Sequence, residues 1–472
     1  MVLNLGKNIM KSRVLLYVSV FLFSVFFLTG CTSDENKNIS ENLTQEGLEL
    51  YEERYYKEAM DKFVEALEKY PSNFEAYAGL ADILLDKGFF EEVEDLANEA
   101  SVRVDNTQAA EIYSMIGEKY YEIERYEKSQ KMFEKAVSAD GNYEKGRVGL
   151  AGAHIWLGDI REASRALGNR GESDEFLLLY SFLTFDDWEE GVKKVSEISD
   201  DDLRGRMESI YEIDDEDVLY KNTSLAREYI NAGYPFLAIE LLSKQDGEIE
   251  QYPDGQYFLG RAYLDYGNYE RAIEKLNAAL MLDVDDDEVY INLARANLFN
   301  NNVERALNAY EAVVSGENLN FLEEYIDVLL ENDMKNKAQT ILIDLIAQED
   351  SFGLNIMLGK VYYERSELDK MGEVLEKLEE ETNLTQAETK ELKRYKILYA
   401  VEDIDNEVEL DGLIERYSVF DRYDPEVYLF RGKLLKHQEE ILEAQEAFER
   451  AIELDLKGDV SKQAEKLLAS MN

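Results

Sequence analysis

Residues 225–229 read LAREY, residues 259–263 read LGRAY and residues 293–297 read LARAN. Each copy begins 34 residues after the one before it. A fixed period of this length indicates a repeat array, in which one unit cannot bury its apolar face alone and packs against the next. The period therefore predicts a fold of stacked units, and such a fold favours binding over catalysis.

Each unit has the pattern of two amphipathic helices, with small residues where the helices cross and a large residue filling the gap. In the first unit Gly47 lies on the first helix, and Ala59 and Phe63 lie on the second. The same pattern recurs at Gly117, Ser129, Phe133 and Ala136; at Gly260, Ala272 and Ala279; and at Gly432, Ala444, Phe448 and Ala451. Paired helices are therefore the repeating element.

The units resemble tetratricopeptide repeats, and the resemblance extends over 42–472. It implies an all-α fold, a right-handed superhelical solenoid of about twelve helix-turn-helix repeats with a C-terminal capping helix. The expected organisation is an N-terminal array at 43–171, a degenerate repeat or hinge at 172–217, a central array at 218–350, eroded repeats at 351–424, and a last repeat with its capping helix at 425–472. The wholly acidic run at 214–217 favours the hinge.

The N-terminal segment 1–30 differs from the rest of the chain because it contains no acidic residue. Lys7, Lys11 and Arg13 precede an apolar run at 14–28. A basic start followed by a short apolar run predicts a secretory signal peptide, since the run is short for a membrane span.

Residues 28–31 (LTGC) resemble the lipobox of bacterial lipoproteins. The resemblance implies that Cys31 becomes a lipidated N-terminus, carrying palmitate-type chains, and that 31–42 is a polar tether. It also implies a cell-membrane location on the extracytoplasmic side, or the outer membrane in a host with two membranes. A second interpretation is an uncleaved transmembrane anchor that ends at an unmodified Cys31. Met1 and Met10 both remain open as the translation start.

The chain carries 101 acidic and 51 basic residues, a formal net charge of −50. Phosphate backbones and anionic headgroups repel such a chain, so nucleic-acid binding is disfavoured and membrane contact is expected through a lipid. The single cysteine leaves no intrachain disulfide. Hydrophobic residues make up 45% of the chain, too many for a disordered protein.

The sequence contains no enzyme constellation, no Gly-rich phosphate loop and no paired-Cys metal motif. His154 takes a position held by tyrosine in other repeats, which predicts a packed, hydrogen-bonded core residue, whereas His437 is expected in an exposed turn. The acidic run 283–288 lacks the glycine and the final carboxylate of an EF-hand loop, so it predicts an inter-repeat turn, with weak calcium binding as a minor alternative. We expect no catalysis, no cofactor and no metal.

Arg227, Arg261 and Arg295 occupy the same position in three successive units. In tetratricopeptide repeats the first helix of each hairpin lines the concave groove, and the resemblance implies that these arginines form a ladder within it. Lys360 takes an equivalent place, and Asn292 lies one turn before Arg295. With one aromatic residue for stacking, the candidate groove residues are Arg227, Arg261, Arg295, Asn292, Tyr257 and Lys360.

Two interpretations of the arginines remain open. An anionic ligand, such as a C-terminal carboxylate, an acidic peptide or an anionic wall polymer, would gain ~1.5–3 kcal/mol from each sheltered bidentate contact. Alternatively, the arginines neutralise neighbours such as Asp265 on a solvated face, where a pair contributes ~0–1 kcal/mol. The N-terminal units carry Asp82, Glu118 and Gly152 at this position, so the groove is expected to change from acidic to basic.

The function expected from these features is a membrane-anchored extracytoplasmic scaffold that binds protein partners through its concave groove. One alternative is a glycan- or peptide-binding lipoprotein, which would need a closed pocket. Another is a self-assembling structural protein. An enzyme would require converging carboxylates within 172–217.

Overall fold

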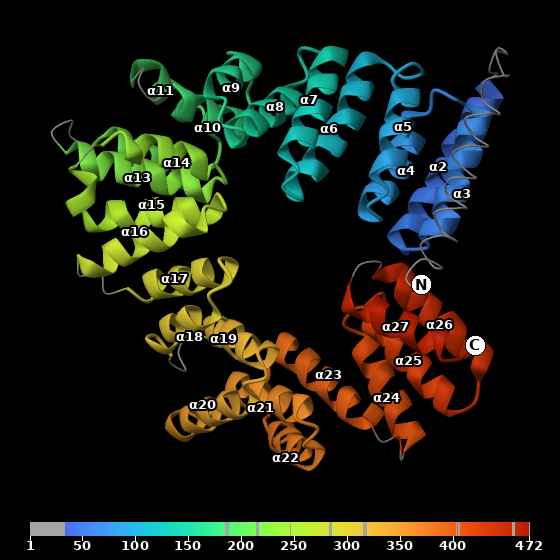
Figure 1. The fold of residues 1–472 in the computed structure, drawn as a ribbon. Coiled ribbons are helices and arrows are strands. Elements are labelled where there is room, and N and C mark those ends of the chain that lie inside the picture. The colour runs from blue at the N-terminus through green and yellow to red at the C-terminus, as the bar shows by residue number, and fades with distance from the viewer. Residues whose placement is uncertain are drawn as a thin grey trace. The chain divides into compact units, whose positions relative to one another are not determined.

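The computed structural model describes residues 34–184, 188–213, 217–245, 247–282, 286–314, 319–402, 404, 406–455 and 458–471. The expected signal segment 1–30 and Cys31 lie outside these residues, as do 214–216 and 283–285 in the two acidic runs. Throughout the described ranges the regular structure is helical, with no strand (Figure 1). The predicted all-α fold of consecutive helix-turn-helix units is confirmed.

The chain divides into two compact units, one ending at Asn302 and the other beginning at Val303. The first unit contains α2 (Asp34–Glu52), α3 (Tyr56–Lys69), α4 (Phe74–Asp86), α5 (Phe90–Ala100), α6 (Asn106–Glu122), α7 (Tyr126–Ala139), α8 (Glu144–Trp156), α9 (Ile160–Leu167), α10 (Asp174–Leu183), α11 (Trp188–Val195), α12 (Asp201–Tyr211), α13 (Val218–Asn231), α14 (Pro235–Ser243), the 3-10 helix η2 (Ile249–Gln251), α15 (Pro253–Asp265), α16 (Tyr269–Met281) and α17 (Asp287–Phe299). The second contains α18 (Val303–Glu311), α19 (Leu319–Glu331), α20 (Lys335–Gln348), α21 (Phe352–Glu364), α22 (Leu368–Glu379), α23 (Gln386–Glu402), α24 (Glu407–Ser418), α25 (Pro425–His437), α26 (Ile441–Leu454) and α27 (Asp459–Ala469). The expected hinge at 172–217 contains α10, α11 and α12, and its role as a hinge stays a prediction.

The turn inside the hairpins has a recurring backbone geometry. In the α4–α5 hairpin Gly88 has φ 70°, and the amide of Phe89 donates to the carbonyl of Leu84 at 2.8 Å, which closes the end of the first helix. The positive-φ residue is glycine at 88, 158, 233 and 267, and it carries a side chain at 54, 124, 301, 333, 366 and 439. The turn geometry is therefore kept even where glycine is absent.

Phenylalanines of the second helices are buried against glycines of the first helices. Phe133 on α7 is 1% exposed and lies between Gly117 on α6 and Gly149 on α8. A Cβ added to Gly149 would lie 2.2 Å from the Phe133 ring, and one added to Gly117 would lie 3.0 Å from it. The ring thus occupies the volume of the missing side chains, which explains why these crossing positions hold glycine. Phe63 is enclosed by glycines in the same way.

The second unit ends in the expected capping helix. Ala464 of α27 is fully buried in a cluster that contains Phe448 and Ala451 of α26. Val460 and Leu467 of α27 pack against the same cluster. The helix therefore covers the apolar face of the last hairpin.

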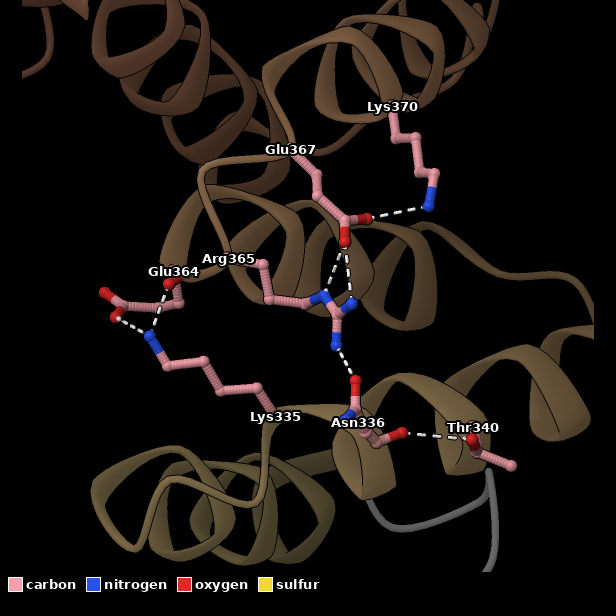
Figure 2. Close-up of polar contacts among 7 residues, drawn as sticks. All are labelled: Lys335, Asn336, Thr340, Glu364, Arg365, Glu367 and Lys370. Carbon is pink, nitrogen blue, oxygen red and sulfur yellow. Dashed lines mark hydrogen bonds and ion pairs between the residues drawn. The ribbon is translucent and has the colours of Figure 1, made fainter.

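Polar side chains link the turn of one hairpin to the preceding hairpin in the second unit, as Figure 2 shows. Arg365 follows α21, and its Nε and Nη2 donate to Glu367 Oε1 at 2.9 and 2.7 Å. Its Nη1 reaches Asn336 Oδ1 near the start of α20. Lys370 on α22 lies 2.8 Å from the other Glu367 oxygen, and the two cations lower the pKa of this carboxyl. The turn is thus held by charge-assisted hydrogen bonds.

Within the first unit, the α8–α9 turn contacts hairpins that lie much later in the chain. Trp156 Nε1 donates to the carbonyl of Gly233 at 3.1 Å. The hydroxyl of Tyr266 donates to the carbonyl of Trp156 at 3.3 Å, although the two residues are 110 positions apart. Helices α8 and α14 are also in contact. These contacts bring the hairpin turns of non-consecutive repeats together, and a pocket forms beside them.

Candidate ligand pocket and the arginine positions

Arg227, on α13, lies beside a buried carboxylate. Its Nε is 3.4 Å from Glu228 Oε1, and Arg206 Nε on α12 is 3.2 Å from Glu228 Oε2. The Glu228 side chain is 3% exposed, whereas that of Arg227 is 47% exposed. Two arginines therefore balance one buried charge, and the Arg227 side chain still reaches solvent.

Arg261 and Arg295 both act on Asp265. Arg261 on α15 places Nε 4.0 Å from Asp265 Oδ2 and donates Nη2 to Asn231 Oδ1 at 3.3 Å. Burial raises the pKa of Asp265, and the charges of Arg261 and Arg295 oppose that rise. The pairing with Asp265 that the sequence left open is therefore present, while binding of an anionic ligand stays a prediction.

Asn292 and Tyr257 contact each other. Asn292 on α17 is 6% exposed, and its Nδ2 donates to the Tyr257 hydroxyl on α15 at 3.4 Å. Burial raises the pKa of Tyr257, against the effect of the Arg261 charge. These two predicted residues thus join the first helices of adjacent repeats.

Lys360 lies on α21 in the second unit, where its surroundings are acidic. Its Nζ is 2.6 Å from Asp327 Oδ1 and 3.7 Å from Glu323 Oε1 on α19. It lines a cavity of about 200 Å³ that also contains Glu391 and Tyr395. Burial raises the pKa of Glu391, with Glu323 as a further cause. Lys360 therefore balances carboxylates of its own unit.

A cavity of about 910 Å³ lies in the first unit. We call it the rim pocket because hairpin turns and helix ends form it: the α6–α7 turn with Glu124, Tyr126 and Glu127; the end of α8 with Trp156 and Leu157; the α15–α16 turn from Leu264 to Gly267 together with Tyr269; and Asn292, Arg295 and Phe299 of α17. Two of the predicted groove residues, Asn292 and Arg295, therefore line it.

Aromatic rings form much of the rim pocket. Tyr126 and Trp156 stack with centroids 4.4 Å apart and planes 10° apart, and Trp156 stacks on Tyr266 at 5.7 Å. On another wall Tyr269 and Phe299 stack at 5.2 Å, and Phe299 is 59% exposed. Offset stacking of this kind stabilises each ring contact by ~0.5–1.5 kcal/mol beyond its buried area. The rings are therefore held in place while part of their surface faces the cavity.

The rim pocket carries more negative than positive side chains. Glu124, Glu127 and Asp265 face one arginine, Arg295. The Asp265 side chain is 41% exposed, so its charge remains accessible from the cavity. The arrangement can pair with a cation and stack against a flat group.

The aromatic residues of this pocket were missed from the sequence. Nothing local in the sequence connects residues 266–269 with Trp156 or Tyr126. The sequence did hold a signal for an aromatic position at the start of the second helix. An aromatic residue recurs there at Tyr56, Phe90, Tyr126 and Tyr269, two places after the residue that has positive φ in the structure.

The acidic residues that were predicted to line the groove in the N-terminal repeats lie near further carboxylates. Glu118 lines a cavity of about 320 Å³ with Glu175, Lys145 and Gly152. Burial raises the pKa of Glu118 and of Glu175, and Lys145 opposes both rises. Asp82 is half-buried on α4, where burial and the Asp86 charge raise its pKa to about 6.

The two histidines differ in exposure as expected. His154 is 9% exposed, in agreement with the predicted packed core residue. Its Nδ1 makes no hydrogen bond within the described residues, so the predicted hydrogen bonding is not found at this atom. His437 is exposed, with Nε2 3.4 Å from Glu407 Oε1. No group of three or more potential ligands that could hold a metal occurs in the part of the chain that the structure describes. In that same part, no helix combines the length and apolar character required to cross a bilayer.

Two sequence models described as tetratricopeptide repeat match the chain, one at 263–318 and the other at 110–143 and 425–457. The last two segments coincide with the α6–α7 and α25–α26 hairpins. The chain carries tetratricopeptide repeats. These repeats indicate a scaffold for protein–protein interaction, as the sequence suggested.

Two solved structures resemble the tetratricopeptide-repeat chain over most of its length. They are the crystal structure of the APC/C hetero-tetramer Cut9–Hcn1 and the structure of Naa15/Naa10 bound to HypK-THB, each with a TM-score of 0.36 and 12% identity. The first match covers 92% of this chain and 96% of that one, and the second covers 91% and 96%. TM-scores this low carry no functional argument. No curated protein matched the chain in sequence.

Proposed function

We propose that this tetratricopeptide-repeat protein is a lipid-anchored scaffold that holds protein partners on the extracytoplasmic side of a membrane, with no catalysis of its own. The basic and apolar run at 1–30 and the LTGC sequence at 28–31 support the anchor. The stacked hairpins support a binding role, because each repeat adds first-helix side chains to a continuous surface.

The observation that carries the proposal is that the arginines on successive first helices are held by neighbouring side chains and still reach solvent. The side chains of Arg227 and Arg261 are 47% and 33% exposed, and each is oriented by a partner on its own hairpin or the preceding one. Arg295 faces the rim pocket. Cations that are oriented and still reach solvent suit recognition of a partner, since little side-chain entropy remains to be lost on binding.

Affinity capture from detergent-solubilised membranes tests the proposal. The full-length protein is compared with a triple variant carrying Arg227→Gln, Arg261→Gln and Arg295→Gln. Glutamine is preferred to glutamate because a carboxylate at 227 would lie beside the buried Glu228 and destabilise the fold. We expect a protein partner to be retained by the wild type and reduced at least about tenfold by the variant, the loss of roughly 1.4 kcal/mol or more.

The matched control is Arg206→Gln, which also removes a cation from Glu228 but lies on α12 rather than on a repeat first helix. It should retain the partner. A Cys31→Ala protein should leave the membrane fraction and lose uptake of a palmitate analogue. Equal capture by the triple variant, or a Cys31→Ala protein that stays lipid-labelled, would contradict the corresponding part of the proposal.

A further inference from the structure

The aromatic position that follows the hairpin turn is occupied in several repeats of the first unit. Tyr56, Phe90, Tyr126 and Tyr269 each lie two residues after a positive-φ position, at the start of a second helix. Their rings contact residues at the turn of the following repeat.

In the first two of these repeats a cation of the following turn covers the ring. Lys87 Nζ lies 3.7 Å from the centroid of Tyr56, and Lys87 is 7% exposed. Arg125 Cζ lies 5.8 Å from the centroid of Phe90. Attraction between a cation and the ring face stabilises such contacts. The fold itself thus shows that this ring position accepts a cationic side chain.

In the two repeats that form the rim pocket, another aromatic ring takes the place of that cation. Trp156 covers Tyr126, and Phe299 covers Tyr269. The rings line a cavity of about 910 Å³.

The charge of the rim pocket agrees with a cationic occupant. Glu124 and Glu127 lie beside Tyr126, and Asp265 lies beside Tyr266, while Arg295 is the arginine that lines the pocket with them. Arg261 also pairs with Asp265. The chain as a whole carries a net charge of −50, so its field raises the local concentration of cations. A neutral sugar would gain from the rings but not from this field.

We propose that the rim pocket binds an arginine or lysine side chain of an extended basic peptide segment. The cationic group stacks against the Phe299 ring, which is 59% exposed, while Asp265 and Glu127 accept its hydrogen bonds. The inference rests on the proposed scaffold function and names the partner chemistry at a surface distinct from Arg227. The negative excess of the pocket comes from Glu124 and Glu127, in addition to the Asp265 carboxylate that Arg261 and Arg295 partly balance.

Tryptophan fluorescence gives a direct test because the chain has two tryptophans. A Trp188→Phe protein leaves Trp156 as the reporter inside the pocket. The probes are a short peptide of alternating Gly and Arg, the same peptide with Gln in place of Arg, and a tetramer of N-acetylglucosamine. We expect saturable, salt-sensitive binding of the Arg peptide and none of the other two.

Charge and ring variants locate the binding. In the same background Asp265→Asn and Glu127→Gln should each weaken the Arg peptide about two- to fivefold, and Phe299→Leu should do so by a similar factor. Glu208→Gln removes the charge of an exposed side chain on α12, outside the pocket, and should leave the affinity for the Arg peptide unchanged. Glu127 is exposed, so this variant keeps its fold even if Asp265→Asn does not.

Binding of the Gln peptide or the sugar as tightly as the Arg peptide would overturn the inference. So would equal losses in Glu208→Gln and Glu127→Gln, which would indicate non-specific attraction. A membrane partner captured by a protein that ignores the Arg peptide would leave the scaffold function intact and refute the pocket chemistry alone. Conversely, peptide binding without any captured partner would count against the scaffold function alone.

Discussion

Asp82 is a residue whose surroundings oppose its charge. It is half-buried on the first helix α4, and burial together with Asp86 raises its pKa to about 6. Asp86 itself accepts a hydrogen bond from the Tyr51 hydroxyl at 3.1 Å. A carboxyl group with a folded pKa above its unfolded value reduces stability at neutral pH. This cost disappears as the pH falls through the folded pKa.

Asp82→Asn should therefore stabilise the protein only where Asp82 is charged. At about pH 7.5 we expect the free energy of unfolding to rise by about 1–2 kcal/mol, after allowance for partial solvation. At about pH 4 the wild-type side chain is protonated and the difference should vanish. Urea unfolding at both pH values measures this. Asp95→Asn, an exposed change on α5, should stay within about 0.5 kcal/mol of the wild type. A gain that is the same at both pH values would contradict the assignment.

At the scale of the element, the hairpin turn imposes the same backbone conformation on different residues. Glu439 has φ 64° between α25 and α26, and the next amide donates to the carbonyl of Leu435 at 3.0 Å. Gly267 has φ 81° at the equivalent position between α15 and α16. A side chain in this left-handed conformation costs roughly 1–2 kcal/mol, which the rest of the hairpin offsets.

Substitutions of the positive-φ residue at these two turns should change the free energy of unfolding in opposite directions. Glu439→Gly should stabilise the protein by about 0.5–1 kcal/mol, because the relief of strain exceeds the greater entropy of glycine in the unfolded chain. Gly267→Ala should destabilise it by about 1 kcal/mol or more. Denaturant midpoints of the two variants, compared at unchanged helicity, provide the measurement. A loss of stability in Glu439→Gly would show that the side chain contributes contacts that outweigh the strain.

At the scale of the whole molecule, the repeating part of the fold was predictable and the contacts between distant repeats were not. The 34-residue period and the Gly117–Phe133 pattern specify local packing, which each hairpin repeats. Arg261 and Asp265 are four residues apart on one helix, so their pairing was foreseeable. The rim pocket depends on a contact between Trp156 and Tyr266, and a pattern of period 34 holds no information about contacts 110 residues apart.

The net charge of −50 sets a further property of the whole molecule, its response to salt. Added salt screens the mutual repulsion of excess carboxylates, which stabilises the folded array, but it also weakens ion pairs. Many of these pairs are solvent-exposed, such as Arg165–Glu162 with side chains 73% and 47% exposed, and exposed pairs contribute only ~0–1 kcal/mol. Repulsion therefore dominates, and Tm at neutral pH should rise as sodium chloride increases from about 0.02 to 0.5 M. Near pH 4.4, where the chain is close to neutral, the rise should disappear or reverse. A Tm that falls with salt at neutral pH would mean that the ion pairs outweigh the charge imbalance.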